Sequence, residues 1–218
     1  AGDASRFIKD QEGDNITSLV GQTILYDQRD NRFDPHEGYF VQYSTDFAGV
    51  GGSVRYLRNR LSGGKFWPLA ETWTFGVTAR AGIVAGLGRR VRINDRFFLG
   101  GESLRGFEPA GVGPHDKFSG DALGAKRFYS TTGELSFPVG FPEELGVSGK
   151  LFVDAGSASD PDDKGPEVED SNLIRTSVGV GLAWRSPFGP IRVDLAKALV
   201  KEDFDRTQVL HFSFGTRF

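Results

Sequence analysis

Most of this 218-residue chain consists of stretches in which apolar and polar residues alternate one by one. In residues 147–156, for example, Leu151 and Val153 lie on one side of the alternation, and Phe152 and Asp154 lie on the other. A period of two predicts β-strands, and the helical period is nearly absent. We predict about nine strands, at residues 15–27, 38–47, 53–61, 72–85, 127–139, 147–156, 174–184, 190–199 and 210–218.

The apolar face of these strands indicates a membrane β-barrel instead of a soluble sandwich. No run approaches the 18 apolar residues of a transmembrane helix, whereas most strands have the roughly 9–11 residues that cross a bilayer at a tilt. A soluble sheet presents a polar outer face. Here one face is apolar, with aromatic residues toward its ends, and the other is small, polar or charged, as in an outer-membrane barrel. These aromatic residues are Tyr39, Trp67, Trp73 and Phe218.

The lengths of the connections alternate in the same way. Residues 34–38, 62–70, 138–146 and 186–189 form fairly short joins, whereas residues 86–124 and 157–172 form long polar ones. Outer-membrane barrels have short periplasmic turns and longer external loops. We therefore predict that residues 86–124 form a long external loop, although the joins at 48–52 and 200–206 are short external turns.

Residues 97–113 of that loop contain one arginine, Arg105, with three glycines close to it and Phe107 beside it. The glycines, at positions 100, 101 and 106, permit backbone conformations with positive φ and close approach to another wall. We interpret the loop as one that folds back and docks. The alternative is an ordinary exposed loop with a surface arginine.

Composition excludes several other classes of protein. A net charge of −3 gives no argument for nucleic-acid binding. The absence of cysteine fits an extracytoplasmic setting. The chain also lacks methionine and a signal peptide, so we expect it to be a processed form or part of a longer protein.

Five segments, in this order, resemble the C-terminal part of the BamA-type outer-membrane assembly barrel. The superfamily also includes the mitochondrial sorting barrel, TamA and the two-partner secretion transporters. The segments are YDQRDNRFDPHEGY (26–39), RFFLGGESLRGF (96–107), LFVDAG (151–156), VGVGLAWRSPFGPIRVDLA (178–196) and FSFGTRF (212–218).

The resemblance implies an all-β, antiparallel transmembrane barrel of sixteen strands, of which residues 1–218 form the C-terminal portion without a POTRA domain. It also implies that the 86–124 loop enters the lumen, where Arg105 meets the aspartate of the F-x-D-x-G strand. The implied lumenal lock comprises Gly100, Gly101, Arg105, Gly106 and Phe107, and its wall partners are Glu134, Phe152, Asp154 and Gly156.

Strand alternation independently directs Glu134, Phe152 and Asp154 inward. One guanidinium can bridge two carboxylates through bidentate, charge-assisted hydrogen bonds. The alternative is that both acids simply line a wet lumen.

The last strand resembles the signal by which outer-membrane barrels are themselves recognised. In the family it also forms half of a lateral gate, and a glycine weakens strand pairing. The alternative, compatible with the first, is a plain lipid-facing strand. The residues concerned are Leu210, Phe212, Phe214, Gly215 and Phe218.

The implied function is non-enzymatic: folding and inserting β-barrel proteins in the bacterial outer membrane. We predict no catalytic residue, cofactor or metal site, since the three histidines have no metal-ligand spacing. The expected partners are outer-membrane lipid and lipopolysaccharide, nascent β-barrel substrates, and assembly lipoproteins that bind through the absent POTRA domains. The alternatives are a two-partner polypeptide secretion transporter and a passive channel or structural barrel.

Overall fold

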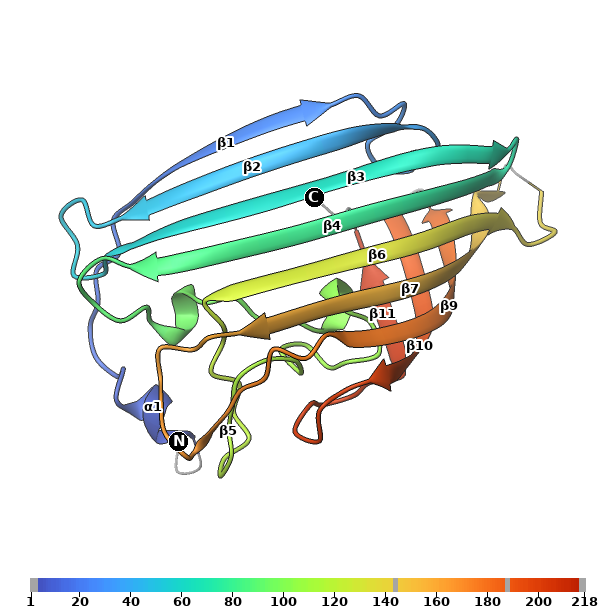
Figure 1. The fold of residues 1–218 in the computed structure, drawn as a ribbon. Helices are drawn as coiled ribbons and strands as arrows, with labels where there is room; N and C mark the ends of the chain where they lie inside the picture. The colour runs from blue at the N-terminus through green and yellow to red at the C-terminus, as the bar shows by residue number, and fades with distance from the viewer. Residues whose placement is uncertain (1–3, 143–144, 187–188, 216–218) are drawn as a thin grey trace.

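The computed structural model describes residues 4–142, 145–186 and 189–215, and its main feature is one antiparallel sheet of nine strands (Figure 1). The all-β prediction and the number of strands are confirmed. Each strand of the sheet pairs with the next one along the chain. In sheet order, the strands are β1 (Leu19–Asp27), β2 (Gly38–Ala48), β3 (Tyr56–Ala70), β4 (Trp73–Gly86), β6 (Arg127–Pro138), β7 (Val147–Ser159), β9 (Arg175–Ser186), β10 (Gly189–Val200) and β11 (Leu210–Phe214).

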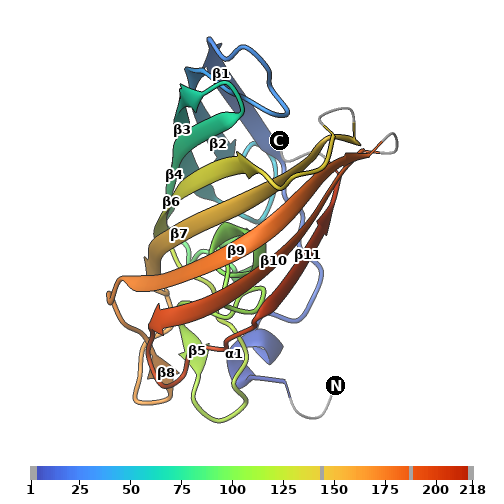
Figure 2. The same ribbon diagram turned by 90° about the vertical axis from the view of Figure 1, so that its right-hand side faces the viewer.

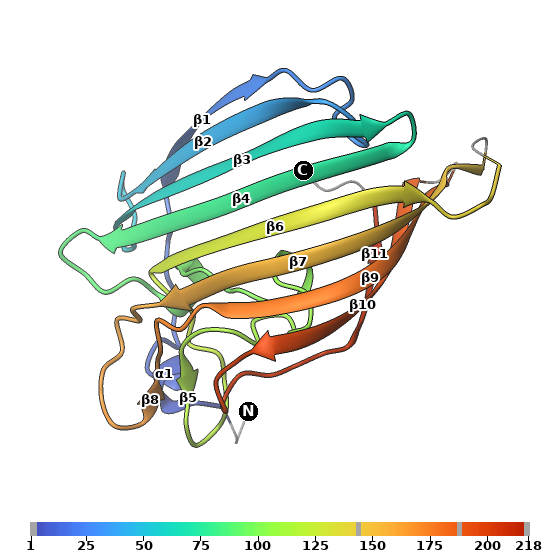
Figure 3. The same ribbon diagram turned by 45° about the vertical axis from the view of Figure 1, so that its right-hand side comes forward.

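The sheet is strongly curved, and the long connections lie on its concave side (Figures 2 and 3). The connection from β4 to β6 crosses this side and has two short 3₁₀ helices. The 3₁₀ helices are η1 (Ile93–Asp95) and η2 (Gly101–Ser103). Further small elements lie at one end of the sheet: α1 (Arg6–Lys9) and the two-stranded sheet of β5 (His115–Asp116) and β8 (Val168–Glu169). In the described part of the chain, no helix is long and apolar enough to span a membrane.

The two faces of the sheet differ in the way that the alternation predicts. On β7, Val153 is 54% exposed on the convex face, whereas Phe152 and Asp154 are buried on the concave face. Outward-facing apolar residues with inward-facing polar ones reverse the pattern of a soluble sheet and suit a lipid-facing wall. Other exposed apolar residues of this kind are Leu151, Val180, Leu182, Val193, Leu195 and Phe212.

The prediction of a connection at residues 62–70 is wrong, because β3 continues to Ala70 and pairs with β4 along its length. The glycines at 63 and 64 resemble a turn, but they make room for a neighbouring strand. A Cβ on Gly64 would lie 2.7 Å from Cε1 of Phe40. Pro68 is tolerated near the strand end, where the register shifts between Pro68 and Ala70.

The first predicted strand also begins too early, and the smallest elements are not predicted at all. β1 starts at Leu19, because Ile16 accepts a backbone hydrogen bond from Ser53 instead of joining the β1–β2 pairing. The four-residue helix α1 is too short to show periodicity. Its Phe7 nevertheless forms a buried cluster with Ile93 and Leu123.

The convex face predicts a specific response to charge. Val153 lies near the middle of β7, so Val153→Lys would place an ammonium group in the apolar layer. We expect a loss of about 2–4 kcal/mol in the free energy of unfolding from lipid bilayers. Urea unfolding in vesicles measures this loss. Val153→Ile is the matched control and should unfold like the wild type. A lysine variant as stable as the isoleucine variant would contradict a lipid-facing position.

Candidate functional site

The loop between β4 and β6 docks on the concave face through its own apolar core. Leu104 and Phe107 are fully buried, and they pack with Leu99 and Val112 of the same loop. The remaining members of this cluster are Ala125 and Ala158, with Phe128 and Ala198 packed against it. The loop therefore forms part of the packed interior.

Two glycines allow the backbone conformation that the loop adopts on either side of Arg105. Gly100 has φ +128°, and a Cβ there would lie 2.0 Å from the carbonyl oxygen of Glu108. Gly106 has φ +91° and lies against the wall, where a Cβ would come within 3.0 Å of the Ser177 Cβ. Positive φ and this close approach both require glycine. Gly101 begins the short helix η2 between them.

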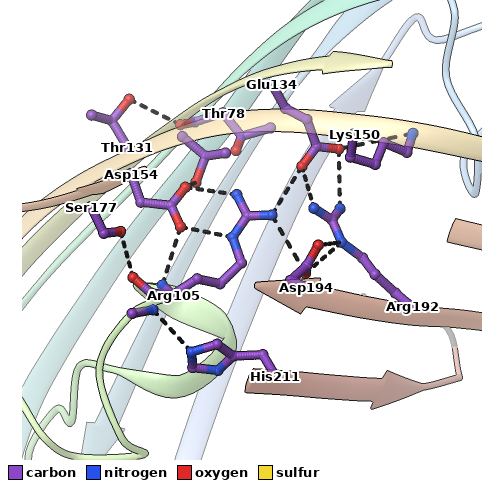
Figure 4. A network of polar contacts seen from close by, with 12 residues as sticks. Thr78, Arg105, Thr131, Glu134, Lys150, Asp154, Ser177, Arg192, Asp194 and His211 are labelled. Atoms are coloured by element: carbon purple, nitrogen blue, oxygen red, sulfur yellow. Dashed lines mark hydrogen bonds and ion pairs between the residues drawn. The ribbon is translucent and has the colours of Figure 1, made fainter. Parts of the chain in front are cut away.

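The side chain of Arg105 is 2% exposed and is held by two carboxylates of the wall (Figure 4). Its Nε and Nη2 donate to the two oxygens of Asp154, each at 2.7 Å, and its backbone N–H donates to Asp154 Oδ2 at 3.1 Å. Nη1 donates to Glu134 Oε2 at 3.1 Å. The structure thus brings together the three charged residues that the sequence analysis singles out, in the bidentate geometry that favours arginine over lysine.

Phe152 lies beneath this guanidinium, whose Cζ is 3.3 Å from the ring centroid. This cation–π contact adds attraction for a desolvated charge. Gly156 is required by space: a Cβ there would lie 2.8 Å from the Tyr129 carbonyl oxygen and 3.2 Å from Leu99 Cδ2. Each residue of the predicted F-x-D-x-G pattern therefore contacts either Arg105 or the loop that presents it.

Three further charged residues extend the site. Arg192 donates to both oxygens of Glu134, at 3.1 and 2.7 Å, and its Nε donates to Asp194 at 2.6 Å. Asp194 also lies 3.7 Å from Arg105 Nη1, and Lys150 lies 3.9 Å from Glu134. We call these six residues the Arg105 network. Its three cations balance its three carboxylates: Arg105, Lys150 and Arg192 against Glu134, Asp154 and Asp194.

Lys150, Arg192 and Asp194 were not predicted from the sequence as part of the site, although alternation contained the signal for each. Lys150 shares the inward side of β7 with Phe152 and Asp154. In β10, the alternation of Ile191 and Val193 with Arg192 and Asp194 directs the two charged residues inward.

Glycines on β9 leave room for the network. A Cβ on Gly179 would lie 2.3 Å from Phe152 Cζ and 2.4 Å from the Leu195 carbonyl oxygen. One on Gly181 would lie 1.9 Å from Asp194 Oδ1. The inward face of β9 is therefore hollow where its neighbours place large side chains.

The outer part of the loop is anchored by other ion pairs. Arg96 Nη1 donates to Asp163 Oδ2 at 2.6 Å, and Lys126 Nζ lies 2.8 Å from Asp162 Oδ1. Burial alone would raise the pKa of Asp162, but hydrogen bonds from Lys126 and the Val91 N–H outweigh it and lower that pKa. The stabilisation from this carboxylate is therefore present above its unfolded pKa and is lost as the pH falls through its lower folded pKa.

A second fully buried pair, which the sequence analysis did not predict, closes the β10–β11 connection. Arg175, the first residue of β9, donates through Nε and Nη2 to Asp205 at 2.9 and 3.0 Å. Both side chains are completely shielded from solvent. The connection into the last strand is therefore held firmly against β9.

The residues that the sequence predicts for the recognition signal and gate of the last strand lie apart from the Arg105 network. Leu210, Phe212 and Phe214 are exposed on the convex face. Gly215 follows the strand with φ +102°. Phe218 lies outside the described residues.

The chemistry of the site is that of a satisfied structural network. Each charged group of the network faces an opposite charge. Within the ranges that the structure covers, no group of histidine and acidic residues is arranged to hold a metal ion. Of the histidines, only His211 touches the loop beside Arg105, as an acceptor for the Gly106 N–H.

Removing the Arg105 guanidinium should leave the buried carboxylate of Asp154 without its main partner and should remove one of the cations that face Glu134. We expect Arg105→Ala to lower the free energy of unfolding by about 3–5 kcal/mol, less where water enters. Lysine should restore only part of this loss, because it cannot form the bidentate contact. Chemical unfolding in vesicles and resistance to heat in detergent gel electrophoresis measure the effect.

The control is Arg90→Ala in the same loop, since that side chain is 78% exposed. It should unfold like the wild type. Wild-type heat resistance and wild-type growth in the Arg105→Ala variant would contradict a structural role for the network.

The hollow face of β9 gives a second prediction. Gly179→Ala should destabilise the sheet by about 1–3 kcal/mol, because the new methyl group overlaps Phe152 and a backbone oxygen. Gly133→Ala on β6 is the matched control, since nothing lies closer than 4.0 Å to its Cβ position. Unfolding midpoints compare the two, and equal losses would contradict the packing described.

Solved structures show the same fold. The described sheet resembles the structure of BamA from Haemophilus ducreyi lacking POTRA domains 1–3, with a TM-score of 0.79 and 22% sequence identity over 89% of this chain and 41% of that one. CdiB from Acinetobacter baumannii is more distant, with a TM-score of 0.59 and 16% identity over 89% of this chain and 32% of that one.

Curated relatives extend the likeness to sequence. The outer membrane protein assembly factor BamA of Neorickettsia risticii is 37% identical over the whole chain, which spans 29% of that relative. BamA of Neisseria meningitidis is 30% identical over 87% of the chain and 27% of its own length. A mouse sorting and assembly machinery component 50 homolog is 28% identical over 84% of the chain and 41% of its own length.

The chain thus spans less than half the length of these relatives. Residues 2–218 match the family model of the Omp85 superfamily domain. With its nine-stranded sheet and docked loop, the chain belongs to the Omp85 superfamily.

Proposed function

We propose that this chain is the C-terminal part of the barrel of an outer-membrane assembly factor, which folds and inserts β-barrel proteins. The superfamily match and relatives named outer membrane protein assembly factor support the proposal. The exposed apolar face suits contact with outer-membrane lipid and lipopolysaccharide, and so a place in the bacterial outer membrane. The proposed activity is non-enzymatic and uses no cofactor.

The observation that carries the proposal is the buried Arg105 network. An inserting barrel must stay intact while its sheet edge is exposed to a substrate strand, so the rest of its wall needs a brace. The network joins β6, β7 and β10 through the loop. In this role the loop residues Gly100, Gly101, Arg105, Gly106 and Phe107 fasten the wall at Glu134, Phe152, Asp154 and Gly156.

The edge in this proposal is β11. It contains five residues and is followed by Gly215, which has a positive φ. An unpaired strand edge offers backbone N–H and C=O groups to an incoming strand. Nascent β-barrel proteins are the proposed substrates, and assembly lipoproteins would bind through POTRA domains outside these residues.

A polypeptide secretion transporter and a passive channel are the alternatives to be tested against. The likeness to CdiB shows the fold alone. A loop packed into the concave side through Leu104 and Phe107 favours assembly over an open pore.

Reconstitution tests the proposal. The protein, as its host produces it, is placed in liposomes, and an unfolded outer-membrane barrel is added. We expect the barrel to become heat-modifiable and protease-resistant at least about tenfold faster than in empty liposomes. The Arg105→Ala protein should lose most of this acceleration, and the Arg90→Ala protein should keep it.

Two results would overturn the proposal. Transport of a soluble polypeptide into the liposomes without insertion of barrels would indicate a secretion transporter. Large, constant conductance in planar bilayers, with no effect on insertion, would indicate a passive channel.

A further inference from the structure

The tip of the loop, Arg105 and Gly106, contacts the last strand as well as the wall. The Ser177 hydroxyl of β9 donates to the Arg105 carbonyl oxygen. The next N–H along the chain, that of Gly106, donates to Nε2 of His211 on β11 at 2.9 Å. Figure 4 shows the His211 ring reaching the backbone beside Arg105, on the side away from Glu134. Two adjacent residues therefore connect β11 to the site that holds Arg105.

β11 needs such a connection, because its pairing is short. Within the described residues, five residue pairs join it to β10, from Leu195–Leu210 to Ile191–Phe214, whereas twelve pairs join β6 to β7. Among the described strands, β11 has no neighbour on its other side. Backbone hydrogen bonds within a sheet set how tightly a strand is held, so a short ladder opens more easily.

The segment that leads into β11 is held by the same loop. The Gln208 N–H donates to the Gly106 carbonyl oxygen at 3.1 Å. The Arg206 N–H donates to the Gly111 carbonyl oxygen at 3.0 Å. The Arg206 carbonyl oxygen accepts from the Glu108 N–H, also at 3.0 Å. The Leu210 end of β11 is therefore fastened to the loop. At the other end, the Gly215 N–H donates to the Pro190 carbonyl oxygen of β10 at 2.9 Å, and the loop makes no such contact there with the described residues.

His211 is the side chain that makes this connection from within the strand. It is buried, and its Nε2 lies 2.9 Å from the Gly106 nitrogen and 3.0 Å from the Gln208 carbonyl oxygen. The nitrogen accepts from Gly106 only when it carries no proton. Gly106 is buried, and its N–H has no other acceptor in the described residues. A proton on Nε2 would be donated to the Gln208 carbonyl oxygen and would leave the Gly106 N–H without an acceptor. Because an unpaired buried N–H is costly, we assign the proton to Nδ1, and the Gln208 contact is then not a hydrogen bond.

We propose that His211 is a positioning residue that couples the loop tip to β11. Docking of Arg105 on the wall then also fixes the Leu210 end of the last strand. The inference rests on the proposed function only in giving β11 the role of an insertion edge.

Hydrogen exchange in the intact, liposome-reconstituted protein tests the coupling. His211→Leu fills the space of the imidazole ring with an apolar side chain and removes the acceptor for the Gly106 N–H. We expect the backbone amides of residues 210–214 to exchange about five- to tenfold faster than in the wild type. The amides of β6 and β7 should exchange at the wild-type rate, because the Arg105 network stays intact.

Two variants separate coupling from general loosening. His211→Gln should restore slow exchange, since the amide oxygen can accept from Gly106. Ser213→Ala changes the same face of β11 and should exchange like the wild type, because the Ser213 hydroxyl has no hydrogen bond to a described residue. The coupling is refuted by wild-type exchange in His211→Leu, by fast exchange in His211→Gln, or by equal acceleration in β6 and β7.

Barrel insertion measured on the same samples separates this inference from the proposed function. Faster exchange in His211→Leu, in a protein that inserts no barrels even as wild type, would support the coupling and overturn the function. Insertion by the wild type, with exchange that His211→Leu leaves unchanged, would overturn the coupling and support the function.

Discussion

The burial of one guanidinium constrains the rest of this structure. A buried charge is tolerated only when opposite charges and hydrogen bonds replace the water that it loses. Arg105 obtains them from strands that are distant in sequence, so the register of each strand matters. Asp154 pairs across the sheet with Ser177, and Asp194 with Gly181. A slip of one residue in β7 would turn Asp154 toward lipid.

The network also explains why this wall contains small residues where a β-sheet usually gains from large ones. Gly156 makes room for the loop, Gly179 for the side chain of Phe152, and Gly181 for that of Asp194. Strand glycines weaken a sheet in isolation. Here the lost propensity is offset by contacts that form only once the loop has docked, so local preference and tertiary packing favour different residues.

Strand alternation sufficed to predict nine strands and the inward direction of Glu134 and Asp154, because the period of two is a local property. The resemblance added the pairing of both acids with Arg105. Alternation does not say which inward residues become neighbours, since that depends on register across strands; Arg192 was therefore missed. The glycines of β3 misled the prediction of its end, because the Phe40 ring that they accommodate belongs to another strand.

The positions of the partners along the chain have a consequence for how the wall assembles. Arg105 meets Glu134 and Asp154, 29 and 49 residues later, and Ser177, 72 residues later; Gly106 meets His211, 105 residues later. Contacts between such distant residues form slowly, after the intervening chain has been ordered. The loop tip can be fully satisfied only when β6, β7, β9, β10 and β11 are all in place. Its docking is therefore a late folding event, which can be completed only after these five strands have formed.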